Sequence, residues 1–372
     1  MQQLTEIRAG KRLLSLDVMR GLIMIFLAAE EAGVYTSLQQ LTTEGSWSYL
    51  LVQQFFHHPW NGLRVWDLVQ PAFMTMAGSA LYISTVQKAG KGTCWAENFR
   101  HVLLRCVKLF FLGIVIHCVY RNRLTWELWN VLTQLSVTTV IAYFIIRKGY
   151  AYQIAVCVVL LLLTECLYRF THIPGYDQPF VNGHNFGNYM DKVLMGKINE
   201  DGWVAINALP TAVHTIAGVL AGKLFLEPLP DRDKIKKLLA VAGLCLLLGY
   251  GLDWLHITPI IKRIATSAFT LASLGWVFIA MAVLYWIHDI RQLNRYAWIA
   301  VAVGTNAIFL YMFFSTVGWQ WFNGFTGIFV KGGLELVAVP EAIRNLVSAL
   351  VVLLLEWYIC YFLYKKKVFI KL

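Results

Sequence analysis

Ten stretches of the chain are apolar over nearly their whole length, and this repetition limits what the chain can fold into. About 20 apolar residues are needed to carry a helix across a lipid bilayer, and each stretch is close to that length. The sequence therefore predicts an all-α fold, a polytopic bundle of membrane-spanning helices. The expected spans are residues 13–33, 65–87, 101–120, 127–147, 150–170, 205–225, 236–255, 265–287, 296–316 and 343–364.

The composition agrees with a membrane protein. Hydrophobic residues make up 58% of the 372 residues and charged residues only 14%, whereas about a quarter of a soluble domain is charged. The 14 Trp and 17 Tyr residues are typical of aromatic belts at the two membrane interfaces. The net charge of +11 comes from short basic clusters between apolar runs. Because no Lys/Arg-rich run with interleaved aromatic residues occurs, nucleic-acid binding is not expected.

The distribution of basic residues predicts the orientation. With ten spans both termini lie on one side, and that side carries about 19 Lys and Arg against about 10 on the other. The positive-inside rule then places both termini in the cytoplasm. We expect a single membrane domain, 1–372, with a cytoplasmic tail, 1–12, and outer loops near 34–64, 171–204 and 317–342. The loop 171–204 is long enough to cover a site, and the aromatic segment 317–330 is a candidate eleventh or re-entrant element.

The start of the chain looks like a signal peptide but is interrupted by charges. Asp17 and Arg20 lie inside the first apolar run, and Glu30 and Glu31 follow where a cleavage site would be, so a retained first span is expected. Spacing of i, i+3 puts Asp17 and Arg20 on one helix face, where we expect a structural ion pair.

The cysteines indicate neither a disulfide framework nor a metal site. The chain has seven, and none forms a C-x-x-C pair. Buried free thiols are the ordinary interpretation, and no metal is expected.

Residues 55–71 concentrate polar chemistry between two apolar runs. The stretch holds two imidazoles, an amide, a guanidinium and a carboxylate, and Pro59 and Gly62 interrupt regular structure before a helix that carries Asp67 near its start. Titratable groups at the mouth of a membrane helix favour a functional site. Interfacial aromatics and helix caps are the alternative interpretation.

Five groups of residues occur in an order that matches a known family. They are Ser15–Gly21; His57–Pro71; Asp201–Gly202 with Leu209–Pro210 and Gly218–Gly222; Pro259–Lys262 with Thr266–Ser267; and Gly304–Ala307 with Tyr311. Together with the hydropathy pattern, they resemble the heparan-alpha-glucosaminide N-acetyltransferase-like transmembrane acyltransferases nearly from end to end.

The resemblance implies a bacterial member in the inner membrane that moves an acetyl group from cytoplasmic acetyl-CoA to the amine of a glucosamine-type sugar outside. It also implies that His57 is the candidate catalytic residue. The chain departs from the family pattern where Glu30 or Glu31 replaces an asparagine, at Leu132–Gln134, and at Gln70, where an aromatic residue is usual. These departures bear on the acceptor specificity and on the activity itself.

Aminolysis of a thioester needs a proton acceptor and donors for the developing oxyanion. His57 could act as a base or be acetylated as a nucleophile. Asp67 could orient His57, hold the sugar amine, or be satisfied by the positive end of its helix. Trp60 and Asn61 are candidate acceptor-binding residues from the same motif, with helix capping as the alternative for Asn61.

The remaining candidates lie elsewhere in the chain. Glu30 could bind a cationic amine or mark a solvated helix end, Asn306 could line a cavity or bond a neighbouring helix, and Lys262 carries a family match. Arg105 and Lys108 could meet the phosphates of CoA or extend to lipid headgroups. Glu165 and Glu356 have no motif around them and are interpreted as structural.

Two other functions remain open: a permease for N-acetylglucosamine or related sugars, and O-acylation of a glycan. The expected partners are the amino-sugar or glycan acceptor, membrane lipids and, as an alternative to a monomer, a second copy of the chain in a homodimer.

Overall fold

The computed structural model describes residues 13–370, in which the long elements are all helices. The all-α prediction is confirmed. The helices are α2 (Leu14–Glu31), α3 (Val34–Gln40), α4 (Trp47–Val52), η1 (Gln53–Phe55), η2 (Val65–Leu68), α5 (Val69–Gly90), α6 (Trp95–Arg121), α7 (Val131–Ile145), α8 (Tyr150–Phe170), α9 (Phe186–Met195), η3 (Ala205–Asn207), α10 (Ala208–Leu226), α11 (Asp231–Trp254), α12 (Ser267–Tyr285), η4 (Trp286–Ile290), α13 (Ala297–Gly304), α14 (Ala307–Phe313), η5 (Phe314–Phe322), α15 (Asn323–Leu336) and α16 (Glu341–Lys365).

Six of these segments are long and apolar enough to cross a membrane: α6, α8, η3 with α10, α11, α12 with η4, and α16. Two bent pairs raise the number to eight if each counts as one span, namely α2 with α3 (57°) and α13 with 307–336 (71°). The expectation of an integral membrane protein is thereby supported. The other two predicted spans correspond to α5 and to α7, which is only 15 residues long. The predicted tail, 1–12, lies outside the described residues.

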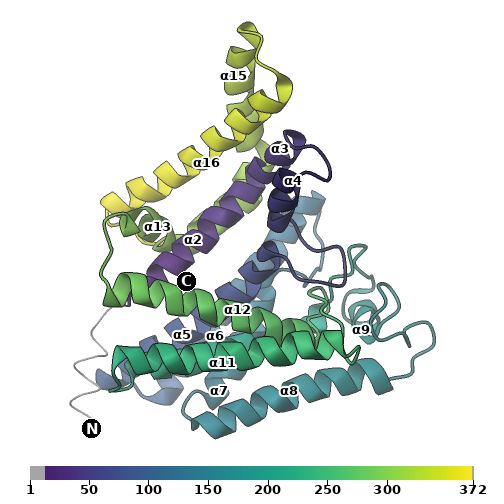
Figure 1. Cartoon of the computed structure of the whole chain (residues 1–372), viewed down its shortest axis with the longest axis vertical. Coiled ribbons are helices and arrows are strands. Elements are labelled where there is room, and N and C mark those ends of the chain that lie inside the picture. Colours follow the sequence, from purple (N-terminus) through teal and green to yellow (C-terminus); the bar gives the residue numbers. More distant parts are fainter. Residues whose placement is uncertain (1–12, 371–372) are drawn as a thin grey trace.

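Helix α10 forms the centre of the bundle and packs against α5 backbone to backbone. A Cβ added at Gly218 would lie 1.9 Å from the carbonyl oxygen of Thr75, so only glycine allows this approach. Ser79 Oγ of α5 donates to the Gly218 carbonyl at 2.8 Å. Helices α11 and α12 lie side by side next to this pair (Figure 1).

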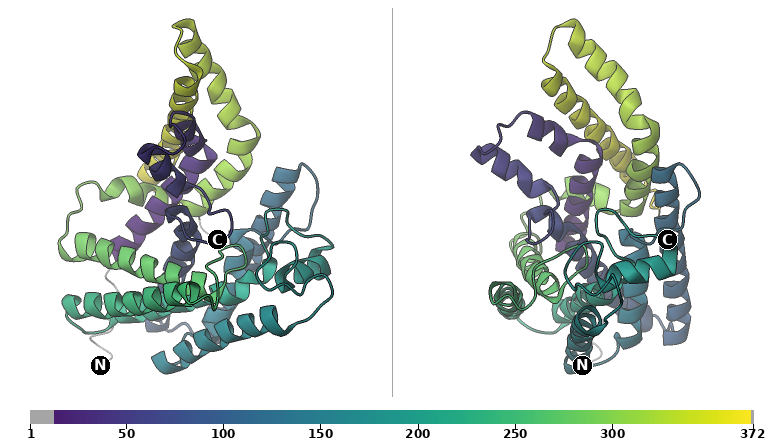
Figure 2. Two further views of the ribbon diagram at one scale, coloured as in Figure 1. Left: turned by 45° about the vertical axis from the view of Figure 1, so that its right-hand side comes forward. Right: turned by 90° about the vertical axis from the view of Figure 1, so that its right-hand side faces the viewer.

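Helices α15 and α16 form a hairpin that projects from the rest of the bundle in every view (Figures 1 and 2). Residues 307–336 form one helical run. Residues 317–342, expected as an outer loop, are therefore helical as far as Leu336 and again from Glu341. The physical reason is that no proline interrupts 307–339, so nothing in that run removes a backbone donor.

Candidate functional site

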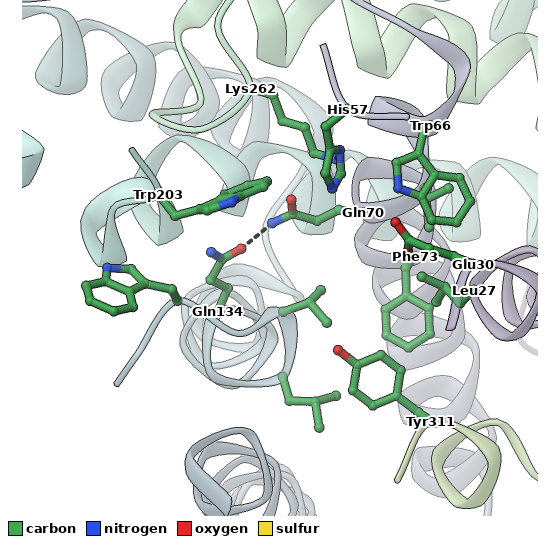
Figure 3. A pocket seen from close by; sticks show the side chains of 14 residues that line it. Leu27, Glu30, His57, Trp66, Gln70, Phe73, Gln134, Trp203, Lys262 and Tyr311 are labelled. Carbon is green, nitrogen blue, oxygen red and sulfur yellow. Dashed lines mark hydrogen bonds between the residues drawn. The ribbon is translucent and has the colours of Figure 1, made fainter. Parts of the chain in front are cut away.

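A cavity opens where α2 ends and α5 and α7 begin. Its non-atom space is about 730 Å³, including the open mouth, which is within the range of small-molecule sites. The lining side chains come from six parts of the chain: Leu27, Glu30, His57, Trp66, Val69, Gln70, Phe73, Trp129, Val131, Leu132, Gln134, Trp203, Lys262 and Tyr311. Figure 3 shows His57 and Lys262 at one end, with Phe73 and Tyr311 farther along the wall.

Three charged or titratable groups meet at this end of the cavity. His57 Nδ1 lies 3.0 Å from Asp67 Oδ1 and 3.1 Å from Lys262 Nζ. Lys262 Nζ is also 3.5 Å from Asp67 Oδ1. Asp67 is fully buried, whereas the His57 side chain keeps 36% of its exposure. The buried Asp67 carboxylate therefore fixes the imidazole on one side, and the ring remains accessible from the cavity.

The local backbone explains why Asp67 sits there. Its second oxygen, Oδ2, accepts hydrogen bonds from the backbone N–H of His58 (3.2 Å) and of Arg64 (3.0 Å). The carboxylate thus closes the turn that begins η2, while Oδ1 faces His57. Four donors surround one buried carboxylate, as a buried charge requires.

A second backbone contact brings Lys262 to the same place across 205 residues. Gly62 N–H donates to the carbonyl of Ile260 at 2.8 Å, and Asn61 forms an antiparallel bridge with Ile261. Gly62 has φ +146°, and a Cβ there would lie 2.6 Å from the His58 ring. Glycine at this position therefore permits the pairing that sets Lys262 beside His57.

The charges favour one protonation state. Because Lys262 has only donors and Asp67 only acceptors, a consistent arrangement has Nδ1–H donating to Asp67 while Lys262 pairs with that carboxylate. Burial, and then the Lys262 charge, lower the pKa of His57 to about 4, although Asp67 opposes this. Burial lowers the pKa of Lys262 to about 8 against the charges of Asp67 and Glu30. At neutral pH the imidazole is neutral, with Nε2 free to accept a proton.

Aromatic rings cover this group. The rings of His57 and Trp203 meet edge to face at 5.5 Å, and Lys262 Nζ lies 5.5 Å from the Trp203 ring. Trp203 belongs to the loop that was expected to cover a site. Trp60 holds this loop because its Nε1 donates to the carbonyl of Phe180 at 2.8 Å.

The same loop is anchored to the connection between α6 and α7. Trp129 Nε1 donates to Asp191 Oδ2 at 2.7 Å, and Asp191 Oδ1 accepts from the Ala205 N–H at 2.8 Å. The buried Glu127 carboxylate bonds Lys197 Nζ at 2.8 Å. These contacts fix the walls of the cavity that carry Trp129 and Trp203.

Several lining residues were not selected from the sequence as site residues. Gln70 donates through Nε2 to Gln134 Oε1 across the cavity (Figure 3). Both glutamines occupy positions where the chain departs from the family pattern, and that was the available signal. Trp66 and Tyr311 belong to the groups that match the family, whereas Trp129 and Trp203 carried no comparable signal.

Some of the residues predicted for the site line the cavity and others do not. His57, Glu30 and Lys262 line the cavity, with Asp67 behind His57. Trp60 and Asn61 are outside the lining set: Trp60 packs under the covering loop, and Asn61 is exposed and pairs through its backbone.

Other candidates lie away from the cavity. Asn306 is buried, donating through Nδ2 to the Val368 carbonyl (3.1 Å) and accepting at Oδ1 from the Ile370 N–H (2.9 Å). Its amide is therefore satisfied by the C-terminal segment, neither by a neighbouring helix nor by the cavity.

Charged candidates on two helices also lie outside the lining. Arg105 and Lys108 are exposed on α6. Arg20 Nη1 lies 3.7 Å from Asp17 Oδ1 on α2, the spacing expected for that pair.

Fold and site together define an integral membrane protein of helices with a cavity that presents a neutral imidazole backed by a carboxylate and an ammonium group. No family model matches the chain. Over 440 aligned residues it is 22% identical to heparan-alpha-glucosaminide N-acetyltransferase of Mus musculus. The alignment takes in 99% of this chain and 62% of the mouse protein. The chain is thus distantly similar over its full length to a membrane N-acetyltransferase and spans less than two thirds of that relative.

Proposed function

We propose that the protein is a membrane acyltransferase that transfers the acetyl group of acetyl-CoA to the amine of a glucosamine-type sugar. The observation that carries this proposal is the His57–Asp67–Lys262 group at the cavity. A permease needs hydrogen-bonding groups for a sugar but has no use for an imidazole held neutral and oriented by a buried ion pair. The distant similarity to a protein named for N-acetyl transfer supports the same reaction.

In the direct route the sugar nitrogen attacks the thioester carbonyl carbon, and a new N–C bond forms. His57 Nε2 accepts the proton that the amine loses. The C–S bond breaks, and the CoA thiolate leaves and takes up a proton. Asp67 holds the ring in the tautomer that exposes Nε2 and stabilises the imidazolium that forms. The same geometry serves a two-step route in which Nε2 first attacks the thioester and then passes the acetyl group to the amine.

Cavity residues supply groups suited to an amino sugar. Trp203 offers an aromatic face, the Gln70–Gln134 pair offers amide donors and acceptors for hydroxyl groups, and Glu30 is an acid exposed in the cavity wall. Trp60 and Asn61 contribute indirectly, by holding the covering loop and Lys262. Arg105 and Lys108 are exposed on α6, away from the cavity, so CoA phosphates would have to reach that exposed side of the helix to bind them.

In the proposed topology the single domain crosses a bacterial inner membrane ten times, with both termini in the cytoplasm. α5 and α7 then supply the two spans beyond the eight. The cavity lies toward the outer face, and the acetyl donor comes from the inside.

The reaction is tested by thiol release. We expect the purified protein, in detergent, to release free thiol from acetyl-CoA when glucosamine is added and to give only a background rate without the sugar. The product is identified as N-acetylglucosamine by co-elution with the authentic sugar and by an acetyl group that withstands mild alkali, which would cleave an O-acetyl ester; this excludes O-acylation. If no sugar-dependent thiol appears while proteoliposomes take up labelled N-acetylglucosamine, the protein is a permease.

The low pKa of His57 predicts unusual pH behaviour. An imidazole with a pKa of about 4 stays neutral, and hence reactive, as the pH falls from 7 to 5, whereas an ordinary one titrates near 6.5. We expect the rate at which diethyl pyrocarbonate modifies His57, followed by peptide mass spectrometry, to be nearly constant over that range. In Lys262→Met the neighbouring cation is lost, so the pKa rises and the rate at pH 5 should fall relative to pH 7. A wild-type midpoint near 6.5 would contradict this assignment.

A further inference from the structure

Two carboxylates that the proposed reaction does not use, Glu31 and Glu356, lie in the region where the end of α2 meets α16 and the π-helical segment η5. Glu356 is 1% exposed, and neither of its carboxylate oxygens has a hydrogen-bond partner among residues 13–370. Glu31 is near enough to interact with it electrostatically. Within residues 13–370, neither carboxylate forms an ion pair with a Lys or Arg. Such a group inside a helical membrane bundle is costly and therefore points to a ligand.

The amide of Asn323 turns a third oxygen toward this place. Its Nδ2 donates to the backbone carbonyl of Glu31 at 2.9 Å, which fixes the orientation of the amide. Its Oδ1 is buried and has no partner among the described residues. A Cβ added to Gly318 would lie 3.4 Å from Glu356 Oε1 and 3.5 Å from Asn323 Oδ1. The two oxygens thus border one small space next to Gly318, which has no side chain to fill it.

A proton alone does not satisfy this arrangement. The two Glu356 oxygens and Asn323 Oδ1 are three acceptors without a donor, and one proton bridges only two of them. The Tyr120 hydroxyl is directed at Glu31 Oε1 at 3.4 Å, and the buried Ser315 hydroxyl of η5 forms no hydrogen bond to any of the three acceptors. A cation can be shared by all of these oxygens at once. A π-helical turn of the kind seen in η5 often marks a functional site.

We propose that Glu356, Asn323 Oδ1 and the Glu31 carboxylate bind a hard metal cation beside Gly318. The donors are all oxygen atoms, which suit Na⁺ or Ca²⁺ and not a transition metal. The bound cation joins the end of α2 to η5, α15 and α16, and so fixes the neighbouring Glu30 in the cavity wall. This inference does not depend on the proposed reaction.

The test is thermal unfolding of the purified full-length protein in detergent. After chelator treatment, samples are compared in choline chloride, NaCl, and choline chloride with CaCl2, at equal ionic strength. We expect one cation to raise Tm by several degrees in a saturable way, because a ligand that binds only the folded state stabilises it. A response to Na⁺ or to Ca²⁺ identifies the ion.

Three variants make the test specific. Glu356→Gln should lose the cation-dependent shift while remaining folded, because the new amide can donate to Asn323 Oδ1. Gly318→Ala places a methyl group at ordinary contact distance in the cation's space, so it should also fold and lose the shift, and it decides the matter if Glu356→Gln does not fold. Glu165→Gln alters a carboxylate paired with Arg169 on α8 and should keep the full shift. An identical wild-type Tm in all three salts, or a shift retained in Gly318→Ala, would overturn the proposal.

Discussion

Replacing His57 with alanine should lower kcat/KM for acetyl transfer by roughly 10²- to 10⁴-fold, the contribution of a positioned proton acceptor. The variant loses the only imidazole that lines the cavity among the described residues. It keeps Asp67 and Lys262, which still form an ion pair at 3.5 Å. Loss of activity should therefore occur with little change in Tm. Sugar-dependent thiol release and thermal unfolding of the same preparation measure the two quantities.

His58→Ala is the matched control. The neighbouring imidazole is outside the cavity lining, and His58 contacts Asp67 through its backbone N–H, which alanine retains. We expect activity within a few-fold of wild type. Equal losses in the two variants would mean that the turn is merely disturbed, and full activity in His57→Ala would remove His57 from the reaction.

The sequence predicted the His57 and Asp67 part of this site because these two residues lie close together in the chain. His57 and Asp67 lie ten residues apart in one polar stretch, and Pro59 and Gly62 indicated the turn that brings them together. The helical class was equally accessible, since apolar runs of membrane length favour helices whatever their packing.

The positions of Lys262 and Trp203 depend on tertiary contacts that the spacing of residues along the sequence does not reveal. Lys262 reaches His57 because Gly62 pairs with Ile260, and only the family resemblance drew attention to this lysine. Trp203 comes from a loop whose path is set by Trp60 and Asp191 side chains. For Asn306, the sequence indicated a costly buried amide but not its partner, the C-terminal backbone.

The length of individual helices was the weakest part of the prediction. The predicted span ended at residue 316, yet the helical run that begins at 307 continues to Leu336. Packing against α16 stabilises this continuation, with Asn323 bonded to Glu31. Tertiary contacts of this kind can extend a helix beyond the end predicted from local sequence, and they cannot be predicted from a single sequence.

Removing the buried carboxylate should produce the largest loss of stability at the site. Asp67→Ala leaves the Lys262 ammonium, which is only 6% exposed, without the carboxylate that pairs with it at 3.5 Å, and leaves the N–H groups of His58 and Arg64 without an acceptor. Breaking a buried ion pair on one side costs about 3–5 kcal/mol. We expect a Tm decrease of many degrees, together with loss of acetyl transfer, because the imidazole is no longer oriented.

A second substitution separates the two effects of Asp67. In Asp67→Asn with Lys262→Met the buried charges are both absent, so most of the stability lost in Asp67→Asn alone should return. Activity should not return, because the replacement amide carries no charge to stabilise the imidazolium that forms when His57 accepts the proton. Thermal unfolding and thiol release of the two single variants and the double variant complete this cycle. If the double variant were as unstable as Asp67→Asn, the unpaired Lys262 charge would not be the cause. If it were as active as wild type, the ion pair would have a purely structural role.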